Sequence, residues 1–281
     1  MPATRPFLPR ILLVFDFDRT LGSDSIDAIL AVYGVERREY ERDFVEPLGE
    51  GWDAIIARGQ ALIDLGRAKG RPLSRRAMAE AARGVSLFPG ALEMPERLRR
   101  VARAIHTDIE PRFVVLSSGY AEIIEATPVP EAFDRVLASS FHYGPDGEAV
   151  CVKRIVSHPE KVLYLQAIAK DVGIEGANAP RAAGRDVDER DRAAPFDQMI
   201  YVGDGASDLL AFGFMNRSGG LALAVDKDRA FDQADAQRPG QRVDNLAPPD
   251  YRPRKELMES LEHAVRACAS RIALRALGRG E

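Results

Sequence analysis

The feature that most constrains the fold is a set of three short apolar runs, each followed at once by polar residues. They are Ile11–Phe15, Arg112–Leu116 and Met199–Val202. Uninterrupted apolar runs of this length, rich in β-branched residues, are typical of strands covered on both faces of a parallel sheet. Between these runs, apolar residues recur at the spacing of α-helices. The sequence therefore predicts an α/β fold with a doubly wound, Rossmann-like parallel sheet, whose ligand site lies beyond the carboxyl ends of the strands.

A block of helical spacing interrupts this alternation after the first strand, with no comparable strand inside it. We interpret it as an inserted α-helical cap. Its expected helices lie near 25–34, 50–69, 74–84 and 91–105. The predicted domains are a catalytic core of residues 1–22 and 106–240, a helical cap of residues 23–105, and a C-terminal extension of residues 241–281 with a long helix.

The remaining segments alternate between strand and helix patterns, with turn-forming and mixed-charge stretches between them. A surface excursion is expected at 175–197, and Leu221–Val225 is expected to be the last core strand. The other expected elements are a strand at 135–138, a hairpin turn at 144–147, helices at 159–172 and 254–277, and a loop at 239–253.

Charge and composition narrow the classes of partner. The formal net charge is −4 and the pI is about 5.7, which provides no broad basic field for nucleic acid or for an anionic membrane. The apolar run at 11–15 is too short for a signal peptide or a membrane span. Cys151 and Cys268 are far apart in the sequence, so neither a disulfide framework nor a zinc site is expected. We expect a cytoplasmic protein with a small substrate; the oligomeric state stays open.

Two carboxylates follow the first strand, in Asp16-Phe-Asp18-Arg-Thr20. Residues two apart in an extended segment point the same way, so both carboxylates are expected at one site. Such a pair is costly unless a cation holds it or one member keeps its proton, which suits a metal-assisted nucleophile beside a general acid. The alternative is a solvated turn with a helix-capping aspartate.

Polar groups also follow the other two strands. Asp204 and Asp208 bracket the end of the third strand, and carboxylate oxygens of this kind suit Mg²⁺. Ser117 follows the second strand and supplies a hydroxyl to a phosphoryl group. Lys161 provides a cation near the start of a helix. Taken singly, each of these residues also fits helix capping, a turn or an exposed surface.

Together these residues resemble the four motifs of the haloacid dehalogenase superfamily, in order and in spacing. The resemblance rests on the segment from Asp16 to Thr20, on Ser117 and Lys161, and on Gly203-Asp-Gly-Ala-Ser-Asp208. It spans about residues 11–225. Within the superfamily the chain is similar to phosphoserine phosphatase-like members through Ser117-Ser-Gly-Tyr120 and Leu87-Phe-Pro-Gly90.

The resemblance implies a role for each motif residue. Asp16 would be the nucleophile and Asp18 the general acid and base. Lys161 would bind the phosphoryl group and also restrain the nucleophile. Ser117, Ser118 and Gly119 would bind the phosphoryl group. Mg²⁺ would be held by Asp16, the Asp18 main-chain carbonyl and Asp204, and Asp208 would orient these ligands. A carboxylate at position 18 is typical of the phosphotransfer members, which disfavours dehalogenation.

The resemblance also assigns substrate choice to the cap. Asp24 would bind a substrate amine and Arg58 a substrate carboxylate; the alternatives are a helix N-cap for Asp24 and a solvated helix face for Arg58. The expected activity is Mg²⁺-dependent hydrolysis of a small phosphorylated metabolite, phosphoserine-like or another phosphomonoester, through an aspartyl-phosphate. A phosphomutase and a non-catalytic, metal-binding regulatory module of the same fold remain as alternatives.

Overall fold

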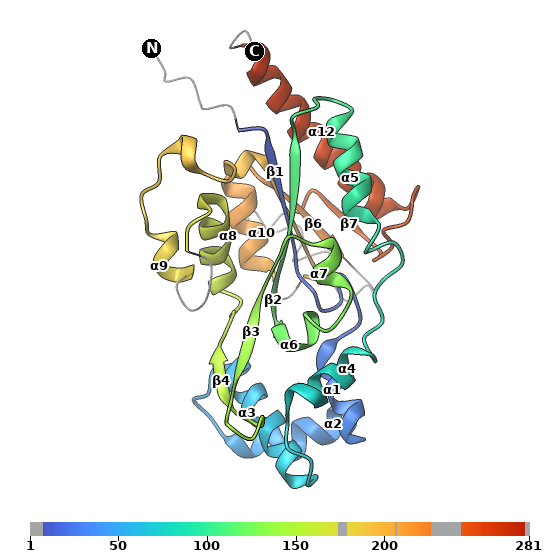
Figure 1. Ribbon diagram of the computed structural model, residues 1–281, viewed down its shortest axis with the longest axis vertical. Coiled ribbons are helices and arrows are strands. Elements are labelled where there is room, and N and C mark those ends of the chain that lie inside the picture. The colour runs from blue at the N-terminus through green and yellow to red at the C-terminus, as the bar shows by residue number, and fades with distance from the viewer. Residues whose placement is uncertain (1–7, 174–178, 206, 226–242, 279–281) are drawn as a thin grey trace.

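A seven-stranded sheet forms the centre of the computed structural model (Figure 1), which describes residues 8–173, 179–205, 207–225 and 243–278. The strand order is β4-β3-β2-β1-β5-β6-β7, and every neighbouring pair is parallel except β3 and β4. This order confirms the predicted fold class. The strands are β1 (Arg10–Phe15), β2 (Glu110–Tyr120), β3 (Arg135–Tyr143), β4 (Ala149–Arg154), β5 (Met199–Gly203), β6 (Leu221–Val225) and β7 (Asn245–Ala247).

The sheet does not end at the strand that the sequence predicts to be last. β7 pairs in parallel with β6, with Leu223 opposite Asn245 and Val225 opposite Ala247. It lies inside the segment predicted to be a loop at 239–253; residues 226–242, which include the predicted boundary at 240, lie outside the described part of the chain. β7 has only three residues in a segment rich in proline, so it carries no strand pattern of its own.

Alternate residues of β1 point to opposite faces of the sheet, as the strand geometry requires. Ile11, Leu13 and Phe15 pack with helices α5 and α12, whereas Leu12 and Val14 pack with α8, α9 and α10. Figure 1 shows these two helical layers on either side of the strands. The helices are α5 (Met94–Arg103), α6 (Ala121–Ile124), α7 (Val129–Ala132), α8 (Glu160–Lys170), α9 (Ala179–Ala183), α10 (Leu209–Arg217) and α12 (Glu256–Leu277).

A separate hydrophobic cluster forms beyond the carboxyl ends of the strands, from helices of the inserted segment. The hairpin of β3 and β4 reaches this cluster, and α3 packs on β4 so closely that a Cβ at Gly59 would lie 2.2 Å from the Val152 Cγ2 atom (Figure 1). The cap helices are α1 (Ser25–Tyr33), α2 (Arg37–Tyr40), α3 (Ala54–Ala68) and α4 (Arg75–Ala82), with a π-helical turn at Glu41–Val45 and a 3-10 turn at Glu46–Leu48.

Three predicted segments pack differently from the expectation. Helix α5, placed in the cap by the predicted boundary at residue 105, packs on the core: Met94 and Leu98 are buried in the same cluster as the sheet. The C-terminal helix is likewise part of this core, because it lies against α5 and the sheet (Figure 1). The described part of the surface excursion at 175–197 buries Ala193 and Ala194 against α8.

An ion pair joins the two helices of this layer. The Arg97 Nε donates to Glu262 at 2.6 Å, and Arg266 donates to the same carboxylate at 2.9 Å. Burial raises the pKa of Glu262, but the hydrogen bonds and charges of the two arginines outweigh this effect, so the pKa falls below its ordinary value of 4.5.

We therefore expect Glu262→Gln to lower the free energy of unfolding at neutral pH. Arg97 is one-third exposed and solvent screens the pair, so the expected loss is about 1 kcal/mol. A carboxylate with a lowered folded-state pKa stabilises above its unfolded value and loses this contribution as the pH falls. Urea unfolding of both proteins should therefore show a difference at pH 7 that shrinks below pH 4.5. A difference independent of pH would contradict the ionic origin.

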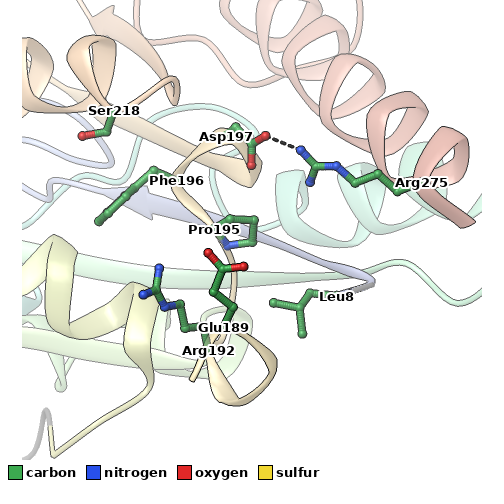
Figure 2. Close-up of a pocket in the computed structure, with 8 residues that line it drawn as sticks. All are labelled: Leu8, Glu189, Arg192, Pro195, Phe196, Asp197, Ser218 and Arg275. Atoms are coloured by element: carbon green, nitrogen blue, oxygen red, sulfur yellow. Dashed lines mark hydrogen bonds and ion pairs between the residues drawn. The ribbon is translucent and has the colours of Figure 1, made fainter. Parts of the chain in front are cut away.

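A hollow of about 160 Å³ lies at the amino ends of the strands, away from the predicted site (Figure 2). Asp197 and Arg275 form an ion pair across it, and Arg275 also donates to Gln198 at 2.6 Å. These contacts attach the end of α12 to the segment that precedes β5. Among the residues that the structure describes, no helix is both long enough and apolar enough to cross a bilayer.

Candidate active site

A cavity of about 280 Å³ lies between the carboxyl ends of the central strands and the cap. Residues from all three predicted strand ends line it together, although they are up to 191 positions apart between Asp16 and Ser207. The cavity is lined by Asp16, Asp18, Arg19, Arg58, Ser117, Ser118, Gly119, His158, Asp204 and Ser207.

Asp16 and Lys161 form a buried ion pair at the floor of the cavity. Asp16 directly follows β1, and its amide donates to the Val202 carbonyl at 2.8 Å, which fixes the turn. Its Oδ1 atom lies 3.0 Å from the Lys161 Nζ. Burial raises the pKa of Asp16, and the Lys161 charge opposes that effect. For Lys161, burial lowers the pKa, but the charges of Asp16 and Asp208 raise it further, so the amine stays charged.

Asp208 is the centre of a hydrogen-bond network beneath this pair. Its Oδ1 accepts from Lys161 at 2.6 Å and from the Tyr201 hydroxyl at 2.5 Å. Its Oδ2 accepts from the Asp204 amide at 3.0 Å and from the Ser207 hydroxyl at 3.3 Å. A Cβ at Gly203 would lie 2.3 Å from that oxygen, so the turn requires glycine there. With both oxygens engaged, Asp208 is placed to orient its neighbours.

Asp16, Asp204 and Asp208 each offer a carboxylate oxygen, and these atoms lie within 4.8 Å of one another. This arrangement fits a hard divalent cation such as Mg²⁺. Burial raises the pKa values of both Asp16 and Asp204, and the charge of Asp208 raises them further. Both effects indicate carboxylates that a cation would stabilise. Because the oxygens of Asp208 are already engaged, Asp16 and Asp204 are the better candidates for side-chain ligands.

Asp18 lines the same cavity. Its Oδ1 accepts from the Ser25 amide at 2.7 Å, which fixes the orientation of the carboxyl group. Burial, and then the charge of Asp24, raise the pKa of Asp18 to about 6. A Cβ at Gly119 would lie 2.7 Å from the Asp18 Oδ2, so the end of β2 must carry glycine there. A carboxyl group with a pKa near neutrality can both give and take a proton.

The end of β2 supplies polar groups to the same cavity. The pairing of β2 with β3 shifts register between Ser117 and Tyr120, which turns this segment out of the regular ladder. The Ser117 Oγ accepts from the Gly119 amide at 3.0 Å. The Ser118 Oγ is buried and has no hydrogen-bond partner among the described residues. A phosphoryl oxygen would satisfy such a hydroxyl.

The two candidate cap residues have different surroundings. Arg58, from α3, lines the cavity and forms no ion pair with any residue that the structure describes. Its position differs from a solvated helix face. Asp24 does not line the cavity. Its side chain accepts from the Ile26 amide at 2.9 Å as the N-cap of α1, which is the alternative interpretation of this residue.

Sequence reasoning missed Arg19, His158 and Ser207, all of which line the cavity. Arg19 lies inside the first motif, between Asp18 and Thr20, so its position alone could have indicated it. His158 precedes Lys161 by three positions and carried no comparable signal. Burial and the charge of Lys161 lower the pKa of His158.

Comparison with known proteins identifies the family. The family model of haloacid dehalogenase-like hydrolases matches residues 13–212, and the chain belongs to this family. This match confirms the predicted superfamily and hydrolase class. No curated protein sequence matches the chain.

Solved structures share the fold. A phospho-aspartyl intermediate analogue of phosphoserine phosphatase has a TM-score of 0.56 and 19% identity, covering 90% of this chain and 98% of that one. A hydrolase of the same family from Salmonella enterica serovar Typhi has a TM-score of 0.58 and 13% identity, covering 89% of this chain and 70% of that one. Cytosolic 5'-nucleotidase IIIB bound to cytidine has a TM-score of 0.51 and 13% identity, covering 97% and 88%.

The buried ion-pair network predicts a large effect of Lys161→Met on stability. The substitution leaves the Asp16 and Asp208 carboxylates buried without a cation, which typically costs about 3–5 kcal/mol. We expect urea unfolding without added metal to show this loss, and Lys161→Met/Asp208→Asn to recover part of it. Lys153→Met, at an exposed lysine of β4, is the matched control. Equal free energies of unfolding for Lys161→Met and Lys153→Met would mean that Lys161 does not stabilise the buried carboxylates.

Proposed function

We propose that the protein is a Mg²⁺-dependent phosphatase that hydrolyses a small phosphomonoester through an aspartyl-phosphate on Asp16. The observation that carries the proposal is the buried Asp16–Lys161 pair, 3.0 Å apart, in a cavity that Asp18 also lines. A carboxylate is a fair nucleophile toward a phosphoryl group once the repulsion between the two anions is reduced. The likeness of the fold to phosphoserine phosphatases supports the same reaction class.

The side chains have separate tasks in this mechanism. Lys161 offsets the charge of Asp16 from the Oδ1 side, so that an anionic phosphoryl group can approach the other carboxylate oxygen. Ser117, Ser118 and Gly119 form the wall of the cavity against which that group is oriented. Asp16, Asp204 and the main-chain carbonyl of Asp18 would hold Mg²⁺, which supplies positive charge to the transferring group.

Asp18 serves both half-reactions. Its carboxyl group, oriented by the Ser25 amide, protonates the leaving alcohol as Asp16 forms a bond to phosphorus. The resulting carboxylate then takes a proton from the water that attacks the aspartyl-phosphate. This attack releases inorganic phosphate and regenerates Asp16. We further propose a cytoplasmic location, with which the two free cysteines, Cys151 and Cys268, are compatible.

A phosphate-release screen with a panel of phosphorylated metabolites tests the proposal. We expect turnover with Mg²⁺, loss of turnover after treatment with EDTA, and recovery when Mg²⁺ is restored. Hydrolysis should give one inorganic phosphate for each ester consumed, whereas a mutase would return the phosphoryl group to substrate. Unchanged turnover after removal of divalent cations would contradict the metal requirement.

A further inference from the structure

Arg19 adopts a backbone conformation that most side chains avoid. Its φ angle is 57°, in the left-handed region that favours glycine, and its amide donates to the Gly22 carbonyl at 2.7 Å. Glycine would adopt this turn without strain. Non-glycine residues held in such a conformation cluster at functional sites, where the side chain has a role.

The Arg19 side chain lies between the site of reaction and the cap. It lines the cavity and is 54% exposed, so it is accessible to a ligand. Its Nε lies 3.5 Å from an Asp204 oxygen and 3.7 Å from an Asp24 oxygen. Arg19 therefore brings positive charge to the part of the cavity between the catalytic carboxylates and α1.

Asp24 is the acidic group that could otherwise attract a cationic substrate from this direction. Its Oδ1 accepts from Arg37 of α2 at 2.8 Å and from the Ile26 amide at 2.9 Å. Arg37 also donates to Asp27 at 2.8 Å, and the Asp24 Oδ2 lies 3.7 Å from the Arg19 Nε. Both oxygens of Asp24 thus have a cationic neighbour within 4 Å, and Asp24 does not line the cavity. The acidic residues that do line the cavity, Asp16, Asp18 and Asp204, are those assigned to the reaction itself.

Two arginines, Arg19 and Arg58, line the cavity together with the catalytic carboxylates. Arg58 lines the cavity from α3, and its charge acts to lower the pKa of Asp18. Arg19 reaches its two carboxylates only at 3.5 and 3.7 Å, longer than a hydrogen bond. Both guanidinium groups therefore offer charged hydrogen-bond donors to a substrate in the cavity.

We propose that Arg19 is a specificity-determining residue, which favours phosphomonoesters whose alcohol part carries a second anionic group and disfavours those that carry an ammonium group. This inference rests on the proposed phosphatase function. A carboxylate or a second phosphate near the cavity mouth would gain charged hydrogen bonds from Arg19. An ammonium group there would meet the like charge of Arg19.

The test compares two small substrates of opposite charge, phosphoglycolate and phosphoethanolamine, with para-nitrophenyl phosphate as a generic third. We expect the wild type to have a kcat/KM for phosphoglycolate at least about tenfold above that for phosphoethanolamine, at saturating Mg²⁺. Arg19→Gly should reduce this ratio about tenfold. Because the ratio compares two substrates of one enzyme, a change in metal affinity that affects both cancels.

Two further variants sharpen the test. Arg19→Asn also tolerates the left-handed conformation and should lower the ratio as Arg19→Gly does, which guards against a folding defect in either. Arg37→Gln should also lower the ratio of the two kcat/KM values, because Asp24 loses a cationic partner. Arg38→Gln, at the exposed neighbouring position, should leave this ratio unchanged. A wild type that prefers phosphoethanolamine, or a ratio unmoved in both Arg19 variants, would overturn the inference while para-nitrophenyl phosphate is still hydrolysed. Failure to hydrolyse all three esters would overturn the phosphatase function as well.

Discussion

Replacement of Asp16 by asparagine is expected to reduce turnover by more than about 10⁴-fold, because it removes the attacking oxygen's charge and a candidate metal ligand together. The substitution preserves side-chain volume at a position that is 4% exposed. It also removes a buried carboxylate whose pKa is raised by the nearby charges of Asp208 and Asp204. We therefore expect a folded but inactive protein, with a melting temperature close to that of the wild type.

The measurement is phosphate release, combined with acid-quenched labelling by a phosphoryl donor. Wild-type protein should retain acid-stable label during turnover, and Asp16→Asn should retain none. Asp146→Asn, at an exposed position in the turn between β3 and β4, is the matched control and should behave as the wild type in both assays. Label retained by a folded Asp16→Asn variant would place the nucleophile at another residue.

The site could be predicted from the sequence wherever its position follows from strand geometry. Asp16, Ser117 and Asp204 each come directly after a buried apolar run, and parallel strands bring their carboxyl ends to one edge of a sheet. Lys161 could be placed only through the family resemblance, because nothing local distinguishes it from a surface lysine. The structure shows it fully buried between two carboxylates.

Features that depend on distant partners could not be predicted in this way. Helix α5 has amphipathic spacing, as the cap helices do, and only its contacts with α12 and with the sheet assign it to the core. Its ion pair joins Arg97 to Glu262, 165 positions further along the chain. Likewise, Asp24 is an acidic residue near the first motif in the sequence, but the arginine that compensates it belongs to another helix. Local patterns contain no information about such pairings.

Asp18→Asn is expected to have the second largest effect on catalysis, a loss of about 10²–10⁴-fold in kcat for an alkyl phosphate, because the amide can neither give nor take the proton. The predicted metal contact of Asp18 is through its main-chain carbonyl, which the substitution keeps. The Ser25 amide can still donate to the side-chain oxygen of asparagine, so the local structure should persist. Binding of Mg²⁺, measured by calorimetry, is therefore expected to change little.

The leaving group separates the role of Asp18 in proton transfer from a role in structure. An aryl phosphate has a leaving group that departs without protonation, so formation of the aspartyl-phosphate should be much less impaired with this ester than with an alkyl phosphate. The next step still needs a base, so labelled phosphoenzyme should accumulate in Asp18→Asn when the aryl ester is supplied. Asp146→Asn should show neither effect. Equal losses with both esters, without accumulation of label, would mean that Asp18 shapes the cavity rather than moving the proton.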